Sequence, residues 1–353
     1  MHQVLGALHH GDAVGDEALA IRGQLRAQGF ASEIYAGRID PRLGSEARSL
    51  REWAGEDGPD AACLYHFSPG SPAGRAALST EGPLGVVYHN VTPVGFFAGW
   101  SDESVLLAQK AEGELKALAL RARVGLAKSA FSRHDLESAG FADARRLPYV
   151  HDLGRLPPPS PVFRKLYADG RTHVLAVGRL APNKRIEDLL RAFALLQRGP
   201  LPRSRLLLVG DLGLRAYADA LDALARALRL REVVFCGHVD PDELQAAYGL
   251  ADVLVSLSEH EGYGVPLVEA MVAGVPVVAY AAGAVTETMD GAGVLLGRKS
   301  PELVAGVIES LVRDRGLREA VLAGQARVAA RVLSTDFGAL LRDALAPLLE
   351  RER

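Results

Sequence analysis

Two loops in the second half of the chain carry residue types that could hold a charged ligand. In VGRLAPNKR, Arg179 stands at the end of a short apolar run and Lys184 lies near the start of the next helical segment. Short apolar runs of this kind are typical of buried parallel strands. Two cations beside the free amides of a helix start are suited to a diphosphate. This loop therefore predicts a diphosphate site, although a lone cation at such a position is usually a solvated charge.

The other loop, HEGYGVPLVEA, places two carboxylates around a glycine-rich turn. Gly262 and Gly264 allow the backbone to approach a ligand closely, and the proline that follows fits the first turn of a helix. We expect Glu261 in the loop and Glu269 one turn into the helix. Because a carboxylate is a poor partner for phosphate, both glutamates should serve hydroxyl groups of a sugar or a ribose. Each residue alone is more often structural, so the prediction depends on their joint occurrence.

The elements that must position these loops can be read from the hydrophobic pattern. In the second half we expect strands at 173–177, 205–209, 233–235, 253–255 and 275–279. The segments 186–193 and 214–228 between them have helical spacing. Strands that alternate with helices predict a doubly wound α/β domain, whose ligands bind beyond the carboxyl ends of the strands. Both loops lie there.

The first half repeats this pattern, with expected strands at 3–8, 33–36, 61–66, 85–89, 124–127 and 146–150. The proline-rich stretch HDLGRLPPPSP favours an extended connection between two domains. We therefore place the first domain at 1–155 and the second at 156–335. Helical patterns continue after 299, and 336–353 is expected to be a C-terminal helix, with packing back on the first domain as one option.

Length and composition exclude several classes of protein. A chain of 353 residues favours two domains, and 48% hydrophobic and 24% charged residues with a net charge of -3 indicate a globular protein that does not bind nucleic acid. Cys63 and Cys236 lie far apart in apolar runs, which argues against disulfides and zinc. We expect no metal and no cofactor. Without a signal-peptide pattern or a bilayer-spanning stretch, the expected location is the cytoplasm.

The spacing of the two glutamates is more specific than either residue. Glu261 and Glu269 form an E-x7-E signature, and with Arg179, Lys184 and the GYG turn the region 172–296 resembles the donor-sugar half of a retaining glycosyltransferase of the GT-B fold, in family four (glycosyl transferases group 1). The resemblance implies that the two cations bind the donor diphosphate. It also implies that Glu261 meets the transferred sugar and Glu269 the nucleotide ribose. The remaining implied donor-binding residues are Gly262, Tyr263, Gly264 and Val265.

The same resemblance implies two Rossmann-like domains that face each other across a cleft, with an acceptor-side domain at 1–155 and a donor domain at 156–335. Many family members have adjacent glycines in the first loop, whose amides reach the donor phosphate. Here the loop reads HHGDAVGDE, which departs from that pattern. Either Gly11 or Gly15 is expected to take this role.

Three candidate strands of the first half end in histidine. A histidine at a strand end of this domain lies near the reacting sugar carbon in the family, and His89 in YHNVTP is the best match, with His66 behind it. A loop histidine bonded to nearby backbone is the alternative, and the spacing gives no sign of a zinc site. Asn90, Thr92 and Lys128 lie on similarly placed loops and are predicted to contact acceptor or donor. The predicted catalytic set is His89, Arg179, Lys184 and Glu261.

These features together lead us to expect a retaining hexosyltransferase that moves a sugar from a GDP- or UDP-linked donor to an acceptor hydroxyl. GDP-mannose is the first expectation, because GDAVGDEAL and YHNVTP resemble loops of mannosyl-transferring members that build surface polysaccharides. Two alternatives stay open: a GT-B nucleotide-sugar epimerase and a non-catalytic sugar-nucleotide binding protein. A nicotinamide dehydrogenase is disfavoured because no G-x-G-x-x-G follows any expected strand.

The acceptor is expected to be a glycan or a lipid-linked molecule. Residues 110–165 contain 11 Lys and Arg against 6 Asp and Glu. Such local positive charge fits an anionic lipid-linked acceptor or peripheral contact with the inner face of the membrane. A solvated helix face explains the same excess equally well.

Overall fold

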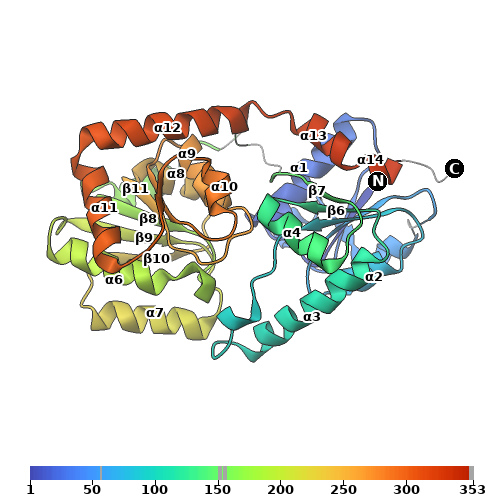
Figure 1. Cartoon of the computed structure of the whole chain (residues 1–353), viewed down its shortest axis with the longest axis horizontal. Helices are drawn as coiled ribbons and strands as arrows, with labels where there is room; N and C mark the ends of the chain where they lie inside the picture. Colours follow the sequence, from blue (N-terminus) through green and yellow to red (C-terminus); the bar gives the residue numbers. More distant parts are fainter. Residues whose placement is uncertain (56–57, 150–152, 154–156, 350–353) are drawn as a thin grey trace. The chain divides into compact units, whose positions relative to one another are not determined.

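The computed structural model describes residues 1–55, 58–149, 153 and 157–349 (Figure 1). They form two compact units, neither of which is one continuous stretch of sequence. Unit 1 takes its residues from Met1–Gly95, Asp102–Asp152 and Asp336–Arg353, and unit 2 from Phe96–Ser101 and Leu153–Thr335. The domain boundary that the sequence predicts, between 155 and 156, lies outside the described residues.

Unit 1 contains a seven-stranded parallel sheet in the order β3-β2-β1-β4-β5-β6-β7. Its strands are β1 His2–Leu5, β2 Ile34–Ala36, β3 Arg48–Ser49, β4 Cys63–His66, β5 Leu84–Tyr88, β6 Val124–Ala127 and β7 Ala144–Arg146. Its α-helices are α1 Ala13–Ala27, α2 Pro72–Leu78, α3 Asp102–Ala119, α4 Ala130–Ala139, α13 Phe337–Ala344 and α14 Ala346–Leu349. Apolar side chains of α1, α13 and α14 pack on one face of this sheet, and those of α2, α3 and α4 pack on the other.

Unit 2 contains a six-stranded parallel sheet in the order β10-β9-β8-β11-β12-β13. Its strands are β8 Thr172–Val177, β9 Ser204–Val209, β10 Val233–Gly237, β11 Val253–Ser256, β12 Val277–Tyr280 and β13 Val294–Leu296. Its α-helices are α5 Pro161–Tyr167, α6 Ile186–Arg198, α7 Arg215–Ala227, α8 Pro241–Leu250, α9 Val265–Val272, α10 Val285–Met289, α11 Pro301–Arg313 and α12 Arg315–Leu333. The last unit 2 helix, α12, is followed by α13 of unit 1.

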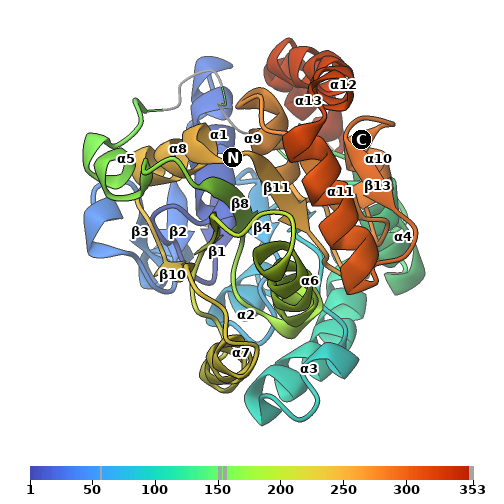
Figure 2. The ribbon, with the colours of Figure 1, turned by 90° about the vertical axis from the view of Figure 1, so that its left-hand side faces the viewer.

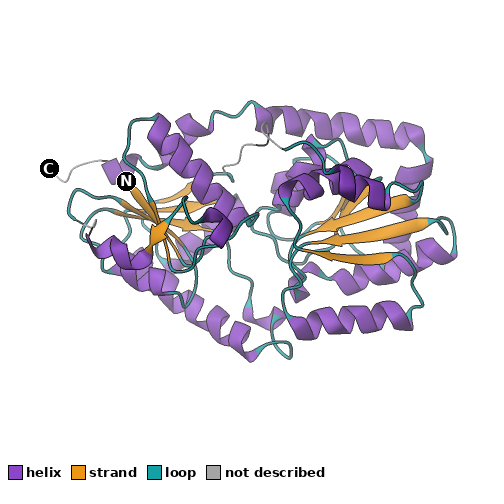
Figure 3. Ribbon diagram, turned by 180° about the vertical axis from the view of Figure 1, so that it is seen from behind, coloured by secondary structure: helices purple, strands orange, loops and turns teal. Residues whose placement is uncertain are grey.

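Helices cover both faces of the unit 2 sheet, as Figure 3 shows. Apolar side chains of α6, α7 and α11 pack on one face, and those of α5, α8, α9 and α12 pack on the other. Figure 2 shows α6 and α9 on opposite sides of β8 and β11. Successive residues of β9 alternate between the two cores, with Leu206 and Leu208 in one and Leu207 and Val209 in the other. Burial on both faces is the reason that these strands are unbroken apolar runs.

The short segment Phe96–Ser101 belongs to unit 2 although its neighbours in sequence belong to unit 1. The Phe96 ring lies 6.2 Å from the His260 ring, and the Trp100 ring lies 5.1 Å from the Tyr217 ring, edge to face. Aromatic contacts at these distances are favourable beyond the area that they bury. Nothing in the sequence pattern indicates this exchange.

The α/β class, the two doubly wound sheets and the helical C-terminal part are confirmed. The expected strands agree with the structure within a few residues, except at sheet edges. The strand expected at 146–150 is wrong in position, because β7 runs Ala144–Arg146 and Pro148 has no amide with which to continue the ladder. The edge strands β3 and β13 were not expected. In the described part of the chain, no helix combines the length and the apolar composition needed to cross a membrane.

Candidate functional site

The two loops singled out by the sequence meet beyond two neighbouring strands of unit 2. β8 and β11 pair side by side, and the chain leaves β8 toward one edge of the sheet and resumes at β11 toward the other. Such a reversal opens a place for ligands at the carboxyl ends of the strands. Lys184 ends a short 3-10 helix, η5 Pro182–Lys184, after β8, and Glu261 lies between β11 and α9. Lys184 Nζ lies 2.6 Å from Glu261 Oε1, which makes a half-buried ion pair.

Asn183 holds these loops in register. Its side-chain amide donates a hydrogen bond to the carbonyl of His260 at 3.0 Å. Its own carbonyl accepts hydrogen bonds from the Glu259 amide at 2.8 Å and from the Ser258 hydroxyl at 3.0 Å. Asn183 is buried, so these bonds are protected from competition with water. Asn183 precedes Lys184, and His260 precedes Glu261, so the bond between them fixes Lys184 relative to Glu261.

The charges around the ion pair neutralise one another. Arg185 lies 3.3 Å from Asp188 and 3.4 Å from Glu259, and the Lys299 ammonium lies 2.9 Å and 2.8 Å from the same two carboxylates. Lys184 is thus the cation that faces Glu261 at this end of the sheet. Arg179, on the same loop as Lys184, is exposed, and its guanidinium has no ion-pair partner within the described ranges.

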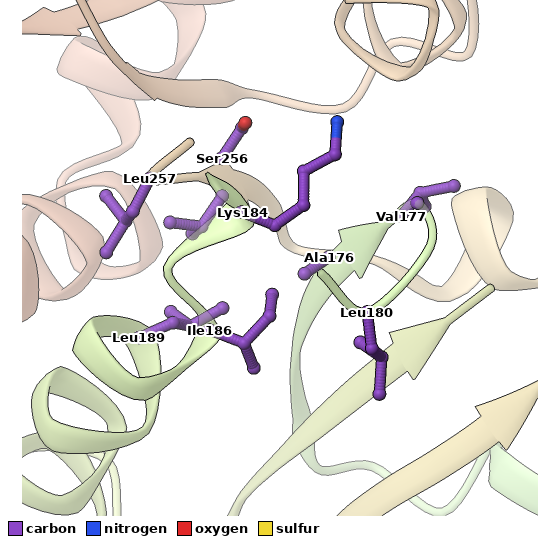
Figure 4. A pocket seen from close by; sticks show the side chains of 10 residues that line it. Ala176, Val177, Leu180, Lys184, Ile186, Leu189, Ser256 and Leu257 are labelled. Carbon is purple, nitrogen blue, oxygen red and sulfur yellow. The ribbon is translucent and has the colours of Figure 1, made fainter. Parts of the chain in front are cut away.

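A small pocket lies at the carboxyl end of β8 and is lined in part by Lys184 (Figure 4). Leu180, Ile186 and Leu189 line one side of it, whereas the Lys184 ammonium and the Ser256 hydroxyl lie on the other side. The apolar side keeps the lysine stem in place, and the charged end extends beyond it. This arrangement directs the ammonium toward the loops rather than into the core.

The loop after β12 supports the backbone of Glu261. The amide of Ala284 donates a hydrogen bond to the Glu261 carbonyl at 2.9 Å. Gly283 has a φ of +57°, and a Cβ at this position would lie 2.4 Å from that same carbonyl oxygen. Only glycine fits this approach without moving the loop.

We expect Gly283→Ala to lower the free energy of unfolding by about 2 kcal/mol or more, because alanine is strained at positive φ and also contacts backbone. Denaturant unfolding measures this change. Gly297→Ala is the matched control, since its Cβ would meet nothing within 4 Å. Its expected effect is within about 0.5 kcal/mol. Equal stabilities of the two variants would contradict the predicted clash.

The glycine-rich turn begins helix α9. Gly264 is the residue before the helix, with a φ of +90°, and its missing Cβ would lie 2.8 Å from Leu267 Cδ1. The Tyr263 carbonyl accepts a hydrogen bond from the Thr288 hydroxyl, which ties the turn to α10. The start of α9, with its positive dipole end, thus follows Glu261 by four residues. Gly262 and Val265, which complete the predicted donor-binding set, lie in this turn and at the first helical position.

Glu269 lies on α9 and has one side-chain partner on α8. The Tyr248 hydroxyl donates a hydrogen bond to Glu269 Oε2 at 2.7 Å. Burial raises the pKa of the Glu269 carboxyl above its usual value, and the Tyr248 hydrogen bond acts in the opposite direction. Burial also raises the pKa of Tyr248 well above its usual value, so this hydroxyl stays protonated and remains a donor.

In unit 1 the two predicted histidines lie together. His66 ends β4, and His89 follows β5, which pairs with β4. His66 Nδ1 lies 3.0 Å from His89 Nε2, and the two rings are stacked. His66 Nε2 lies 2.8 Å from the Gln3 side-chain oxygen on β1. His66 is fully buried, whereas 13% of the His89 side chain is exposed, so His89 is the one that can reach a ligand.

Lys128 lies inside unit 1, with 3% of the residue exposed. Its ammonium contacts Glu17 Oε1 of α1 at 2.6 Å, and Glu17 is fully buried. Glu17 Oε2 lies 3.6 Å from His89 Nδ1. The sequence predicts contact between Lys128 and acceptor or donor, but its charged group points away from solvent. The structure instead brings Lys128 behind His89.

Glu17, His66 and His89 offer atoms that all lie within 4.8 Å of one another, close enough for a shared cation. The Lys128 ammonium is the cation that contacts this carboxylate, and the two histidine nitrogens are at hydrogen-bonding distance. We therefore interpret the cluster as a hydrogen-bonded network rather than as a metal centre.

The other predicted residues of unit 1 lie at the same end of its sheet. Asn90 has a φ of +70°, and its side-chain amide donates to Asp135 on α4 at 3.0 Å. Thr92 is partly exposed two residues further on. Gly15 is buried in α1, where a Cβ would lie 2.7 Å from the His9 carbonyl oxygen. Gly11 is exposed and has a φ of +68°. Gly15 is thus needed for packing, and Gly11 is the glycine open to a ligand.

Comparisons with known proteins agree with the geometry of unit 2. The family described as glycosyl transferases group 1 matches residues 162–325, which include β8 to β13 and both loops. This segment belongs to the glycosyl transferases group 1.

Proteins with similar sequences come from several organisms. A protein of Methanocaldococcus jannaschii described as an uncharacterized glycosyltransferase is 35% identical over 158 residues, which cover 44% of this chain and 39% of that protein. A GDP-mannose-dependent alpha-(1-6)-phosphatidylinositol monomannoside mannosyltransferase of Mycobacterium tuberculosis is 31% identical over 204 residues, which cover 53% of this chain and 52% of that protein. The chain thus spans between about two fifths and one half of the length of these relatives.

The likeness in fold extends beyond the group 1 segment. The solved structure of the Anabaena protein Alr3699/HepE in complex with UDP-glucose superposes with a TM-score of 0.72 at 19% identity, over 98% of this chain and 99% of that one. At this identity the likeness concerns the fold alone. The chain therefore has the two-unit α/β architecture of the GT-B fold.

Four residues of these sites were not found from the sequence: Glu17, Asn183, Tyr248 and Gly283. Asn183 stands beside Lys184 and is the one that a local signal could have found, because a buried asparagine in a loop usually bonds backbone. Glu17 and Tyr248 lie on helices, where a single polar residue on an apolar face is easily taken as solvated. Gly283 could be recognised only from the structure, in which the backbone of Glu261 passes close to it.

Proposed function

We propose that this protein is a glycosyltransferase that moves a sugar from a nucleoside diphosphate sugar to an acceptor hydroxyl. The observation that carries the proposal is the contact of Lys184 with Glu261 beyond β8 and β11, next to the glycine-rich start of α9. A cation and helix amides suit the diphosphate, and carboxylates suit sugar and ribose hydroxyls. The membership of residues 162–325 in the glycosyl transferases group 1 supports the same activity.

The roles in the reaction follow from charge. The bond between the sugar's anomeric carbon and the phosphate oxygen breaks, and its electron pair stays on the leaving diphosphate. Arg179, Lys184 and the amides of α9 are the groups that stabilise this negative charge. A new bond forms from the acceptor oxygen to the anomeric carbon, and the acceptor's proton leaves with the departing phosphate or with solvent. Glu261 is assigned to the transferred sugar, and His89 keeps its predicted role at the reacting sugar carbon.

Glu269 is assigned to the ribose hydroxyls, whose hydrogen bonds it accepts as a carboxylate. We expect Tyr248→Phe to weaken nucleoside diphosphate binding about tenfold at neutral pH, because the lost hydrogen bond favoured the charged carboxylate. The pKa of Glu269 should rise further in this variant. Because the charged carboxylate is the form that binds ribose, the affinity for nucleoside diphosphate should increase with pH and level off at a higher pH than in the parent. Calorimetric titration between pH 5 and pH 9 measures both effects. Tyr167→Phe, at the last position of α5, is the control, and equal losses in both variants would contradict the assignment.

The donor is proposed to be a GDP- or UDP-linked hexose, with GDP-mannose first. The Mycobacterium tuberculosis relative is named as GDP-mannose-dependent, and the Anabaena structure contains UDP-glucose. Thermal-shift titration with GDP, UDP and ADP and their sugars tests this choice, since a ligand of the folded state raises stability with its concentration. No shift with any nucleotide would contradict the proposed function.

Retention of configuration and a glycan or lipid-linked acceptor are part of the proposal. The anomeric signals of the product, followed by proton NMR from the first turnovers, distinguish retention from inversion. Incubation with donor alone separates transfer from the epimerase alternative, which would form a second sugar nucleotide without acceptor. Binding without turnover over a broad acceptor panel would instead favour the non-catalytic alternative.

The proposed place of action is the cytoplasm, at the inner face of the membrane. Residues 110–165 keep an excess of Lys and Arg when the buried Lys128 is left out, and this supports the location because a lipid-linked acceptor would be presented at an anionic surface. Co-sedimentation with anionic and with neutral vesicles tests this point. Equal binding to both would contradict it.

A further inference from the structure

The network behind His89 consists of buried charged and polar groups, which packing alone does not require. It contains a fully buried carboxylate, a buried ammonium, two histidines and one amide, contributed by α1, β1, β4 and the loops after β5 and β6. We propose that the Glu17–Lys128 ion pair is a positioning device that keeps His89 neutral, with its Nε2 proton donated to His66. The proposal rests on the proposed function only in the role it gives to His89.

Hydrogen-bond directions in the network indicate which ring nitrogens of His66 and His89 carry protons. The Gln3 side-chain nitrogen donates to the Ala18 carbonyl at 2.9 Å, so the Gln3 side-chain oxygen faces His66 Nε2 at 2.8 Å and accepts a hydrogen bond from it. Burial, and then Lys128, lower the pKa of His66 to about 3, so His66 is neutral and its Nδ1 is an acceptor. The donor in the 3.0 Å contact must then be His89 Nε2. A neutral His89 therefore has an unprotonated Nδ1.

The groups that face His89 decide its charge. They are Glu17 from α1, Lys128 after β6 and His66 from β4. Glu17 Oε2 lies 3.6 Å from His89 Nδ1, and this carboxylate alone would favour an imidazolium. Lys128 holds the other oxygen at 2.6 Å and cancels that attraction. Burial, then Lys128 and His66, hold the pKa of His89 well below its usual value.

A neutral His89 has a chemical reason in the proposed reaction. Positive charge develops on the sugar ring as the diphosphate leaves, and a fixed imidazolium nearby would oppose it. A neutral ring does not. The opposite charges of Glu17 and Lys128 give His89 surroundings of zero net charge. A single lysine or a single glutamate could not do this.

The variant Lys128→Met removes the cation and retains most of the side-chain volume. Glu17 then lacks the lysine ammonium while its Oε2 lies 3.6 Å from Nδ1, so His89 should take up a proton at that nitrogen. Long-range 15N–1H correlation spectra of 15N-histidine-labelled protein measure this directly, with His89→Gln to assign the signals. In the parent we expect a neutral His89 that does not titrate between pH 5.5 and 8.5. In Lys128→Met we expect it to titrate in that range.

The double variant Glu17→Gln/Lys128→Met removes both charges and should return His89 to the neutral form. A purely structural ion pair would not produce this reversal. Such an ion pair would leave the His89 signal unchanged, and Lys128→Met and the double variant would be equally destabilised in thermal unfolding. That outcome would overturn the proposal. A His89 that stays neutral in Lys128→Met would overturn it as well.

Activity provides a second readout. In Lys128→Met, turnover should acquire an acidic limb, with at least a tenfold loss below the new His89 pKa, and the double variant should lose this limb. The NMR result does not depend on transfer. If His89 changes charge as expected while no donor is turned over, the proposed function fails and the positioning inference stands. If turnover is normal and His89 does not respond, the inference fails alone.

Discussion

Lys184→Ala should weaken nucleoside diphosphate binding about a hundredfold and reduce turnover by a similar or larger factor. Two effects add. The lost charge-assisted hydrogen bond to phosphate is worth about 1.5 to 3 kcal/mol. In addition, Glu261 loses its partner at 2.6 Å and presents an unpaired negative charge to the incoming diphosphate. Calorimetric titration with the diphosphate and steady-state kinetics with the donor measure the two losses.

The second effect gives this prediction its control. In Lys184→Ala/Glu261→Gln the unpaired charge is absent, so part of the diphosphate affinity should return, by about tenfold. Lys165→Ala, an exposed lysine on α5, should bind as the parent does. If Lys184→Ala binds the diphosphate like Lys165→Ala, Lys184 is not in the phosphate site. If the double variant gains nothing over Lys184→Ala, the ion pair has no influence on the ligand.

Most of the fold could be predicted because the strands of both sheets are buried on two faces and therefore form unbroken apolar runs. The exceptions are at the edges. β7 contains Arg145 and Arg146, and β3 consists of Arg48 and Ser49, because an edge strand has one side open to water and accepts polar residues. β13 has only three residues, Val294–Leu296, after the glycine Gly293. Short or polar strands do not differ from loops in a hydrophobic pattern.

Each donor loop could be located from the sequence because its own residues lie in a short stretch between one strand and the next helix. The side-chain contacts between these loops, and those inside unit 1, could not be predicted. Lys184 and Glu261 are 77 positions apart, and Lys128 and Glu17 are 111 positions apart. The order of strands in each sheet determines these contacts, and a hydrophobic pattern does not contain that order. For the same reason the sequence did not show that Lys128 is buried, since a lone lysine usually lies at the surface.

The pairing also changes what is expected of Glu261. From the sequence, Glu261 contacts only the transferred sugar, so its removal should leave the affinity for bare diphosphate nearly unchanged. In the structure its carboxylate holds the ammonium that the diphosphate needs, and 13% of its side chain is exposed. Binding of bare diphosphate must therefore separate the pair without any compensating contact for Glu261. An intact donor compensates, because its sugar hydroxyls can donate to the released carboxylate.

Glu261→Gln should accordingly have opposite effects on the two ligands. We expect bare nucleoside diphosphate to bind about three- to tenfold tighter, since Lys184 is free, and the intact donor to lose about tenfold in affinity and about a hundredfold in turnover. Calorimetry with the diphosphate and with a non-hydrolysable donor analogue compares them. Glu259→Gln is the matched control on the same loop, and its carboxylate contacts Arg185 and Lys299 rather than Lys184. Weaker binding of both ligands in Glu261→Gln would mean that Glu261 holds the nucleotide itself, and unchanged binding of both would remove it from the site.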